Sequence, residues 1–538
     1  MDTRTLSLWR RFRLAVASLP IHHRASLRPV FFYRDVGQGD GERGARLTAG
    51  RFSFDHRDYS FSLKDGWHGA WPADVRKWLY GFSWLRDLKA LETNEARLCA
   101  RGFIHAWCEQ PPSDELAQDG YLMGQRLANW LGHYEFCLET ATESTQKQVL
   151  EVMLREGRIL AALLPLPPQG WQGLAALRGL LAAFMVLPEQ QGFLLRFQRY
   201  LKPELERLIL ADGTVAERSP EAQFQTVREL QNFVAMYNAM EVSIPFLIMQ
   251  ALEKTCPVLN AFCHGDGKLA IFNGSLERTR EEIQALFENT GRYKAVPTIL
   301  PQGGFARITL GRSLLLIDAG KPPAFGFDNM AHAGTLSFEF SYGMQRLFVN
   351  CGAAKGGAWK EALRASAAHN ALTAEGESCV EFGADGHISR HPSHVSHNHK
   401  STAKAHWIDL SHDGYHAPLG AIWSRSLYLG KEGEDLRGQE LVEGERDLSC
   451  TLRFHIYPTV KVEQEDDDVM LHAEGSLWRF RQSGGDLTIE KDLYLGKGLP
   501  EPAFQIVLTA KEGEVVKNDS GKIQHRQKII WVLERVPD

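Results

Sequence analysis

Residues 331–352, AHAGTLSFEFSYGMQRLFVNCG, decide the fold that this sequence predicts. Apolar and polar residues alternate on both sides of Gly343-Met344. Such alternation is typical of two strands that bury one face, and a glycine-containing pair between them favours a tight turn. The sequence therefore predicts an antiparallel hairpin here, as part of a larger sheet.

The expected turn sets the pairing of this hairpin. With Gly343-Met344 at the tip, Phe338 would pair with Val349 and Phe340 with Leu347. Because side chains alternate between the two faces of a strand, several polar residues would share one side of the sheet. These residues are Ser337, Glu339 and Asn350.

Similar short alternating runs continue to the C-terminus. From about residue 291 they are separated by Gly, Asp and Asn, and long helical patterns are nearly absent. Many short strands in succession predict a large antiparallel β-sandwich and argue against a parallel α/β sheet. The expected strands lie at 306–318, 335–341, 345–350, 421–429, 449–462, 468–473, 475–482, 485–494, 504–509 and 528–534.

The region before these strands has a helical period. From about residue 66 to 290, apolar residues recur at helical spacing, and short Pro, Gly or Asp-Gly breaks separate the segments. Successive helices with short loops pack as antiparallel pairs. We therefore expect an irregular N-terminal arm at 1–65, a helical domain at 66–290 and a β-sandwich domain at 291–538.

Composition narrows the class of protein. The chain has 538 residues, of which 44% are hydrophobic and 24% charged, which is typical of a soluble globular protein. Its 61 Lys and Arg against 66 Asp and Glu give a net charge of −5, so no general basic field favours nucleic acid. The eight cysteines are scattered without a CxxC pair, which indicates free and mostly buried thiols.

No targeting or membrane segment stands out. The N-terminal segment is positively charged, but its apolar run LAVASL is short and matches a secretory signal poorly. The apolar run at 173–187 is broken by Arg178, so no transmembrane segment is expected. The sequence patterns leave both the compartment and the oligomeric state open.

Residues that could carry chemistry cluster around the predicted hairpin. His332 and Asn350 lie near its ends, and Arg364, His369 and Asn370 follow it. Three interpretations are open. The two imidazoles and the amide oxygen of Asn350 could ligate a metal ion. The histidines could satisfy backbone groups of a loop, or Arg364 could oppose a substrate carboxylate while His369 exchanges a proton.

Further polar and aromatic groups lie outside this cluster. His412 and Tyr415 flank the Asp-Gly turn at 413–414, where a tyrosine could act as acid or base in an elimination or could serve packing. In the helical region, Trp130, His133 and Tyr134 lie on adjacent turns. An exposed ring there could stack on a sugar, whereas a buried one would belong to the core.

Three ordered motifs carry a family resemblance. The stretch at 331–352, RASAAHNAL at 364–372 and HDGY at 412–415 resemble the C-terminal domain of the heparinase II/III-like family of polysaccharide lyases. The segment FSFDHRDYSF at 52–61 resembles the part of that family that leads into its helical domain. The resemblance implies an incomplete (α/α) toroid followed by an antiparallel β-sandwich. It also implies cleavage of uronic-acid-containing polysaccharide by β-elimination.

The resemblance implies roles for individual residues. His332 matches the second histidine of the family's His-Ala-His-Ala-Asp pattern, and His369 matches the histidine of its Ala-Ala-His-Asn segment. On this basis His369 and Tyr415 would transfer protons, Arg364 and Asn370 would neutralise the carboxylate, and His332 would position the substrate. Sugar contacts would come from Trp130, His133, Tyr134 and His412.

The sequence departs from the family pattern at several of its polar positions. Met330 replaces the first histidine, Gly334 replaces the following aspartate, and Asn350 lies where zinc-binding members have an aspartate. Ala222-Gln223 replaces a Tyr-His pair that the family tends to show after an Asp-Gly loop. A zinc ion at His332, Asn350 and His369 stays an option despite these replacements. The residues present do not themselves require a cofactor.

Two classes of function follow. The first is a bacterial polysaccharide lyase that acts by β-elimination. The second is a lyase scaffold without catalysis that binds acidic envelope glycan. Hydrolysis by paired carboxylates such as Glu339 and Asp413 is a third option. In each case the expected partner is an acidic polysaccharide, and the family resemblance implies a periplasmic location, while the lack of a clear signal peptide keeps the cytoplasm open.

Overall fold

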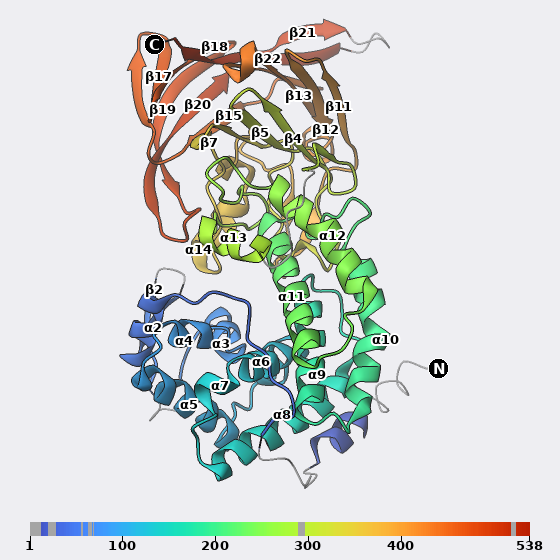
Figure 1. Cartoon of the computed structure of the whole chain (residues 1–538). Coiled ribbons are helices and arrows are strands. Elements are labelled where there is room, and N and C mark those ends of the chain that lie inside the picture. The colour runs from blue at the N-terminus through green and yellow to red at the C-terminus, as the bar shows by residue number, and fades with distance from the viewer. Residues whose placement is uncertain are drawn as a thin grey trace. The chain divides into compact units, whose positions relative to one another are not determined.

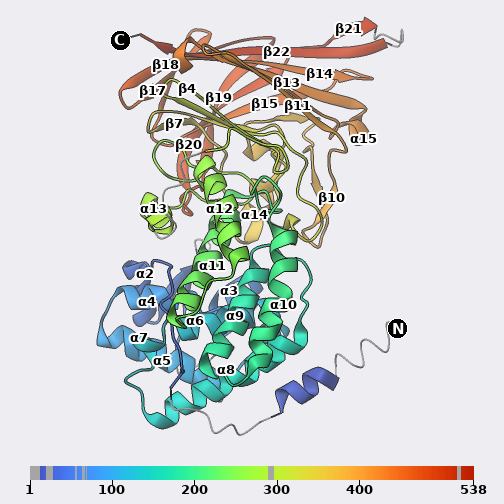
Figure 2. The same cartoon turned by 45° about the vertical axis from the view of Figure 1, so that its right-hand side comes forward.

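The computed structural model describes residues 12–19, 28–54, 57–62, 67, 69–288, 296–517 and 523–537. The chain divides into two compact units, whose elements are labelled in Figures 1 and 2. The helical unit comprises Met1–Leu208, Gln225–Glu253 and Leu286–Gly291, and the β unit comprises Ile209–Phe224, Lys254–Ala285 and Arg292–Asp538. Helices come first and antiparallel strands second, which confirms the predicted fold class. No described helix is both long and apolar enough to cross a bilayer.

Several helices begin where the sequence supplies a cap. The side chains of Thr93, Asp119 and Thr142 accept hydrogen bonds from backbone N–H groups in the first turns of α5, α6 and α8. The helical unit contains α2 Gly41–Thr48, β1 Arg51–Phe54, β2 Arg57–Ser60, α3 Ala73–Tyr80, α4 Leu85–Ala90, α5 Asn94–Glu109, α6 Gly120–Gly132, α7 Tyr134–Cys137, α8 Glu143–Leu163, α9 Gln172–Val186 and α10 Gln191–Leu208. Three more helices contribute residues to both units: α11 Pro220–Ala239, α12 Phe246–Ala261 and α13 Arg280–Glu288.

Helices α6 and α9 approach closely because small residues face each other. A Cβ added to Gly179 would lie 2.4 Å from the Cα of Gly124, and one added to Gly124 would lie 2.4 Å from the Cα of Ala176. A larger side chain at either glycine would therefore force the helices apart. Nearly all of α9 is buried, which explains why its apolar residues do not keep to one face.

Asp35 forms a polar centre inside the helical unit. Its carboxylate lies 3.0 Å from Arg86 and 3.6 Å from Arg178, which in turn lies 2.7 Å from Glu229. Burial alone would raise the pKa of Asp35, but the charges of Arg86 and Arg178 hold it well below its usual range. The buried charges are therefore paired, as buried charges must be.

Two large antiparallel sheets dominate the β unit, each with nine strands in the described part of the chain, and a small sheet pairs β9 with β10. Sheet I has the order β19-β20-β15-β7-β6-β5-β4-β3, with β8 paired to β15. Sheet II has the order β11-β12-β13-β14-β22-β18-β17-β16, with β21 paired to β22. Figures 1 and 2 show them as two layers, which confirms the predicted antiparallel sandwich.

Most strands lie where alternation predicted them. Sheet I consists of β3 Ile299–Leu300, β4 Phe305–Leu310, β5 Ser313–Asp318, β6 Phe338–Tyr342, β7 Gln345–Phe348, β8 Leu372–Ala374, β15 Cys450–Ile456, β19 Gly485–Tyr494 and β20 Glu501–Ala510. Sheet II consists of β11 Val395–Ser401, β12 His406–His412, β13 Ala421–Gly430, β14 Asp435–Gly444, β16 Lys461–Glu465, β17 Asp468–Ala473, β18 Ser476–Ser483, β21 Glu514–Lys517 and β22 Ile523–Val536. Connections include α14 Gly357–Arg364, α15 His416–Leu419, β9 Glu381–Phe382 and β10 Ile388–Arg390.

Aromatic side chains from both sheets fill the space between them. Phe338 of sheet I stacks on Trp531 of sheet II with ring centroids 5.8 Å apart, and Phe340 meets Trp478 edge-on at 5.7 Å. Phe454 of sheet I also contacts Trp531, at 4.9 Å. Each ring removes a large apolar area from water, so these contacts stabilise the sandwich.

The hairpin β6–β7 turns at Gly343-Met344, as predicted, but its register differs. Phe340 pairs with Phe348, so its expected pairing with Leu347 was wrong by one residue. The pairing expected for Phe338 lies beyond β7, which ends at Phe348. The register shifts after Phe340, and such a bulge inserts one extra residue that sequence alternation does not reveal.

Candidate functional site

The polar residues predicted around the hairpin gather in the β unit. We call them the histidine site: His332, Asn350, Arg364, His369 and Asn370. His332 Nδ1 lies 3.2 Å from His369 Nε2, and the other ring nitrogen of His369 lies 2.8 Å from the carbonyl oxygen of Ala365. Burial lowers the pKa of His369 to about 4 and the pKa of His332 well below its ordinary value. Both rings are therefore neutral near pH 7.

Gly334 permits the close approach of His369. A Cβ on Gly334 would lie 2.8 Å from Cδ2 of His369, closer than packed atoms normally come. The next residue towards the N-terminus, Ala333, donates its N–H to the carbonyl oxygen of Arg364 at 2.7 Å. Gly334, which stands where the family resemblance implies an aspartate, thus has a packing role in this chain.

The guanidinium of Arg364 connects the loops that contain Ala331 and Gly386. Its Nε donates to the carbonyl oxygen of Ala331 at 2.9 Å, and one Nη donates to that of Gly386 at 3.0 Å. The guanidinium also lies 3.6 Å from the ring centroid of Phe382. These contacts fix the loop that carries His332. The carboxylate-binding role expected for Arg364 stays a prediction.

Asn350 does not offer a free donor to a metal. Its Nδ2 donates to the carbonyl oxygen of Ile271 at 2.8 Å, and its Oδ1 accepts from the N–H of Asn370 at 3.2 Å. A zinc ion takes at least three protein ligands, commonly imidazole, thiolate or carboxylate. Two imidazoles and an engaged carboxamide do not supply them, so the donor set of His332, Asn350 and His369 does not fit zinc.

The side chain of Asn370 joins three backbone segments. Its Nδ2 donates to the carbonyl oxygens of Phe338 and Val349, at 2.8 and 3.0 Å. Its Oδ1 accepts from the N–H of His455 at 2.7 Å. The amide thereby ties the strand ends of β6 and β7 to β15. Its expected part in neutralising a substrate carboxylate stays a prediction.

Tyr415 and His412 lie in the core of the sandwich. The Tyr415 side chain is 0% exposed, and its hydroxyl donates to the carbonyl oxygen of Leu372. His412 Nδ1 accepts from the N–H of Gly414 at 3.0 Å, and its ring lies 5.1 Å from that of Trp423. Burial raises the pKa of Tyr415 well above its usual value and lowers the pKa of His412 to about 4. Their expected roles in proton transfer and sugar contact stay predictions.

Trp130, His133 and Tyr134 belong to the helical unit, whereas the other candidate residues belong to the β unit. All three are buried, and the Trp130 ring meets Phe82 edge-on at 5.3 Å. His133 Nδ1 lies 2.9 Å from the carbonyl oxygen of Asn129, and burial lowers its pKa to about 4. Stacking on a sugar needs an open ring face, so these contacts support a core role; the sugar-binding role stays a prediction.

Glu339, which alternation placed on the same side of the sheet as Asn350, has a second buried partner in His264. His264 Nε2 lies 2.8 Å from Glu339 Oε2, and Glu339 Oε1 accepts from the N–H of Asn350 at 2.9 Å. Both oxygens of Glu339 therefore bind neighbouring loops. Asp413, the other carboxylate considered for hydrolysis, accepts from the N–H of His394 at 2.9 Å. The alternation of β6 places Glu339 beside Asn350, but nothing in the sequence pairs Glu339 with the distant His264.

A second set of residues lines a cavity of about 480 Å³ on sheet II, which we call the outer groove. Trp407 is 42% exposed, and its ring lies 5.5 Å from that of Tyr428. Arg437 is held by Asp435, with Nη2 and Oδ2 2.7 Å apart. The polar and aromatic lining is Lys400, Trp407, Asp409, Ser426, Tyr428, Arg437 and Gln439.

Alternation in the sequence carries a signal for the outer groove. In β12, Trp407 and Asp409 alternate with the buried Ile408 and Leu410, so the tryptophan points away from the core. Lys400 and Tyr428 pair with Trp407 from the two neighbouring strands. Residues 406–412 were not among the predicted strands, and a tryptophan that alternates with buried apolar residues is the feature that would have drawn attention to this surface.

Known proteins match this chain in sequence. Residues 296–531 match the family described as "Heparinase II/III-like, C-terminal". Among curated proteins, FtsZ-localized protein C of Caulobacter vibrioides (strain NA1000 / CB15N) is 25% identical over 459 residues. That match covers 80% of this chain and 78% of the relative.

Solved structures share the fold. A crystal structure of heparinase III matches with a TM-score of 0.71 and 14% identity, over 98% of this chain and 89% of that one. A heparan sulfate lyase HepC mutant from Pedobacter heparinus matches with a TM-score of 0.58 and 13% identity, over 99% of this chain and 88% of that one. These similarities fit a helical toroid followed by a β-sandwich and make the chain lyase-like in fold. With the motifs around His332 and His369 and the two antiparallel sheets, the match over residues 296–531 shows that this part of the chain is a heparinase II/III-like C-terminal domain.

Proposed function

We propose that this chain binds an acidic glycan through the outer groove and does not cleave it. The observation that carries the proposal is the open aromatic pair of Trp407 and Tyr428 beside Lys400 and Arg437. A sugar ring stacks its apolar face on such rings, as aromatic side chains favour. Its carboxylate is attracted by Lys400, whereas the charge of Arg437 is already paired with that of Asp435. The groove supplies both kinds of contact on one surface.

The state of the histidine site supports binding without cleavage. β-Elimination needs a base, a group that neutralises the carboxylate and an acid for the leaving oxygen. The Tyr415 hydroxyl and the Arg364 guanidinium, which would serve two of these steps, both bind backbone carbonyl oxygens. A group that is buried and already bound does not reach a substrate without rearrangement.

The helical position of the family's Tyr-His pair leads to the same conclusion. Ala222 and Gln223, which stand there, are both 0% exposed. Gln223 Oε1 accepts from the N–H of Val215 at 2.9 Å, and its Nε2 donates to the carbonyl oxygens of Gly213 and Thr255. Gln223 therefore supports loop structure at a position where the family resemblance implies a reacting side chain.

The test is binding of purified full-length chain to uronate oligosaccharides, measured by calorimetry and by tryptophan fluorescence. We expect Trp407→Ala to weaken binding by roughly 10-fold, about 1.4 kcal/mol, because stacking is lost. Trp359→Ala is the matched control, since Trp359 is 49% exposed on α14, outside the groove. No binding to any acidic oligosaccharide, or equal loss in both variants, contradicts the proposal.

β-Elimination is the second candidate, and the neutral imidazole pair favours it. His332 and His369 are uncharged near pH 7, so an imidazole nitrogen could accept a proton. If the chain is a lyase, uronate polymers develop the ultraviolet absorbance of an unsaturated uronate, and His369→Ala abolishes it while groove binding persists. Such turnover would replace the non-cleaving proposal.

The Caulobacter relative supports a further proposal, which concerns where in the cell this chain is located. The name of this relative, FtsZ-localized protein C, describes a protein localized with FtsZ, and the relative is similar to this chain over 80% of the chain's length. We therefore propose that this chain also localizes with FtsZ. A fluorescent fusion imaged together with labelled FtsZ in the native cell should show coincident foci. A signal that stays uniform while FtsZ is focused would contradict this proposal without affecting the glycan-binding one.

A further inference from the structure

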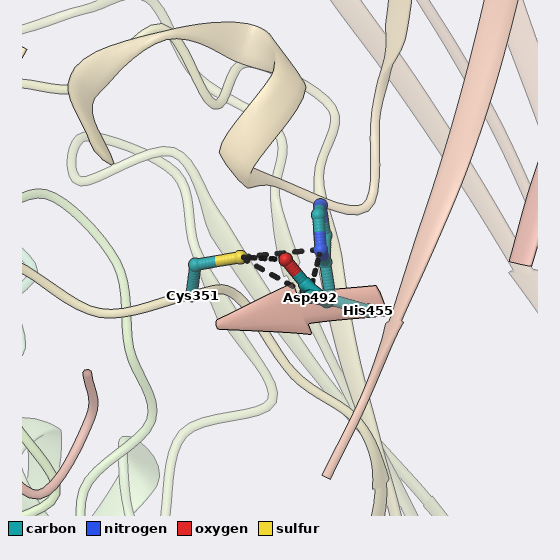
Figure 3. A group of neighbouring side chains, drawn as sticks. All are labelled: Cys351, His455 and Asp492. Carbon is teal, nitrogen blue, oxygen red and sulfur yellow. Dashed lines mark hydrogen bonds and ion pairs between the residues drawn. The ribbon is translucent and has the colours of Figure 1, made fainter. Parts of the chain in front are cut away.

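Three side chains with metal-ligating atoms converge in the β unit, outside the histidine site and the outer groove. Cys351 follows β7, His455 lies on β15 and Asp492 lies on β19. Figure 3 shows them pointing toward one another. Within the described ranges of the chain, this is the one group of three or more His, Cys, Asp or Glu side chains whose ligand atoms all lie within 4.8 Å.

The contacts meet at one ring nitrogen. Cys351 Sγ lies 3.1 Å from His455 Nδ1, and the same nitrogen lies 2.7 Å from Asp492 Oδ2. In a nucleophile–imidazole–carboxylate triad, the nucleophile and the carboxylate face opposite ring nitrogens, so that the ring passes a proton between them. Here both face Nδ1, and no relay is possible. The arrangement is convergent, as metal ligands are.

We propose that Cys351, His455 and Asp492 bind a divalent metal ion of the zinc type, with water in the fourth position. Thiolate, imidazole and carboxylate are the ligands that zinc takes in proteins, and the soft thiolate disfavours magnesium and calcium. The ion would carry two positive charges and would meet one thiolate and one carboxylate. The loaded site is therefore neutral, which suits a buried position.

The distances need only a small adjustment. Zinc with tetrahedral ligands holds sulfur, nitrogen and oxygen atoms about 3.4–3.6 Å apart. Cys351 Sγ lies 3.7 Å from Asp492 Oδ2, so this pair already fits. The two contacts of His455 Nδ1 would lengthen by roughly half an ångström, which small rotations of the side chains provide. On binding, Cys351 gives up its thiol proton and His455 carries its proton on Nε2.

The backbone holds the ligands in place. The N–H of Cys351 donates to the carbonyl oxygen of Ala368 at 3.1 Å, and its own carbonyl oxygen accepts from Leu495 at 2.7 Å. The N–H of His455 is bound by Asn370 at 2.7 Å. A site whose ligands are fixed before the ion arrives loses little entropy on binding. The Asp492 side chain is 13% exposed, against 3% for His455, so an ion would enter from the side of Asp492.

The test uses the full-length chain after removal of metal by chelator and dialysis. Titration with Zn²⁺ against a chromophoric chelator should give one ion per chain. Substitution with Co²⁺ should give the visible bands of a four-coordinate ion and a sulfur-to-cobalt charge-transfer band. At a free Zn²⁺ concentration 100 times the Kd, the thermal midpoint of the β unit should rise by roughly 5 °C, because the ion binds the folded state alone.

Variants locate the ion. Cys351→Ser should remove the charge-transfer band, and Asp492→Asn should weaken Zn²⁺ binding by at least about 100-fold. Cys450→Ser is the matched control, since Cys450 is a buried thiol at the start of β15 that donates to Gln527 Oε1. Asp492 is partly exposed, so its variant keeps the test open if Cys351→Ser does not fold.

Two results would overturn the proposal. One is the absence of stoichiometric Zn²⁺ or Co²⁺ binding by the folded wild-type chain. The other is binding that survives in Cys351→Ser and Asp492→Asn but is lost in His369→Gln, which would place the ion at the histidine site. Neither result bears on glycan binding, because the proposed ligands do not line the outer groove.

Discussion

The histidine site and the outer groove use polar and aromatic residues in opposite ways. At the histidine site, Arg364, Asn350 and Asn370 bind backbone groups, and the two imidazoles contact each other. In the outer groove, the rings of Trp407 and Tyr428 lie against each other beside open space. The first region contains the residue types of catalysis, and the second contains groups with room for a ligand.

The difference teaches that residue type and availability are separate properties. A buried polar group costs free energy unless it finds a partner, so the interior of a sandwich satisfies polar side chains with backbone groups. A group satisfied in this way stabilises the fold and would have to change partners before it could bind a substrate. Four variants, ordered from the largest expected effect to the smallest, test this contrast.

Asn370→Ala should lower the free energy of unfolding of the β unit by about 3–5 kcal/mol. The change leaves two carbonyl oxygens and the N–H of His455 buried without their partner, and each such loss costs about 1–3 kcal/mol. Urea unfolding followed by tryptophan fluorescence measures it. Asn398→Ala on the exposed face of β11 is the control and should change stability by less than about 0.5 kcal/mol. Equal losses in the two variants would remove the structural role assigned to Asn370.

His412 should make the β unit less stable in acid. The pKa of His412 in the folded chain is about 4, against 6.5 for an ordinary histidine. Between pH 6.5 and 4 the unfolded chain therefore binds a proton at His412 that the folded chain does not bind. Stability therefore falls from pH 6.5 down to about 4, and His412→Gln should reduce that fall by roughly 2–4 kcal/mol. Tyr415→Phe, which alters the neighbouring ring without removing an imidazole, should keep the wild-type slope. Denaturant unfolding at pH 7, 5.5 and 4 measures both.

Tyr415→Phe should lower stability by about 1–2 kcal/mol and leave glycan binding unchanged. The variant removes one buried hydroxyl and leaves the carbonyl oxygen of Leu372 without its donor. Thermal unfolding and calorimetric titration with an acidic oligosaccharide measure the two effects. A Tyr415→Phe variant with full stability but altered cleavage of an oligosaccharide would instead support a catalytic role for Tyr415. It would contradict the contrast between the histidine site and the outer groove.

Lys400→Gln should weaken binding of an acidic oligosaccharide roughly two- to fivefold, because an exposed charge contributes about 0.5–1 kcal/mol. The same change should reduce the dependence of the Kd on salt. Lys404→Gln removes another exposed charge, outside the groove, and should have no effect. Identical salt dependence in both variants would mean that charge at the groove does not attract the ligand.

Local pattern predicted much of the fold. Alternation located most strands, and Gly343 marked the hairpin turn. The pairing of Phe340 was not predictable, because a bulge changes register without changing the alternation of residue types. The burial of Trp130 was not predictable either, since an aromatic residue at helical spacing looks the same whether its neighbours cover it or leave it open.

Side-chain clusters that are formed by distant segments could not be predicted from local sequence patterns. Cys351 and His455 are 104 residues apart in the chain, and His455 and Asp492 are 37 apart. Their meeting depends on the order of strands in sheet I, where β15 lies between β7 and β20 and β19 pairs with β20. The sequence predicts that such a sandwich forms, but a strand order of this kind is one of many that the same alternation allows.

The fit of His369 against residue 334 has a consequence for substitution at this position. Gly334→Asp would place a Cβ 2.8 Å from Cδ2 of His369. The imidazole would have to move to make room for it. A carboxylate at residue 334 and the present contact between His332 and His369 therefore exclude each other.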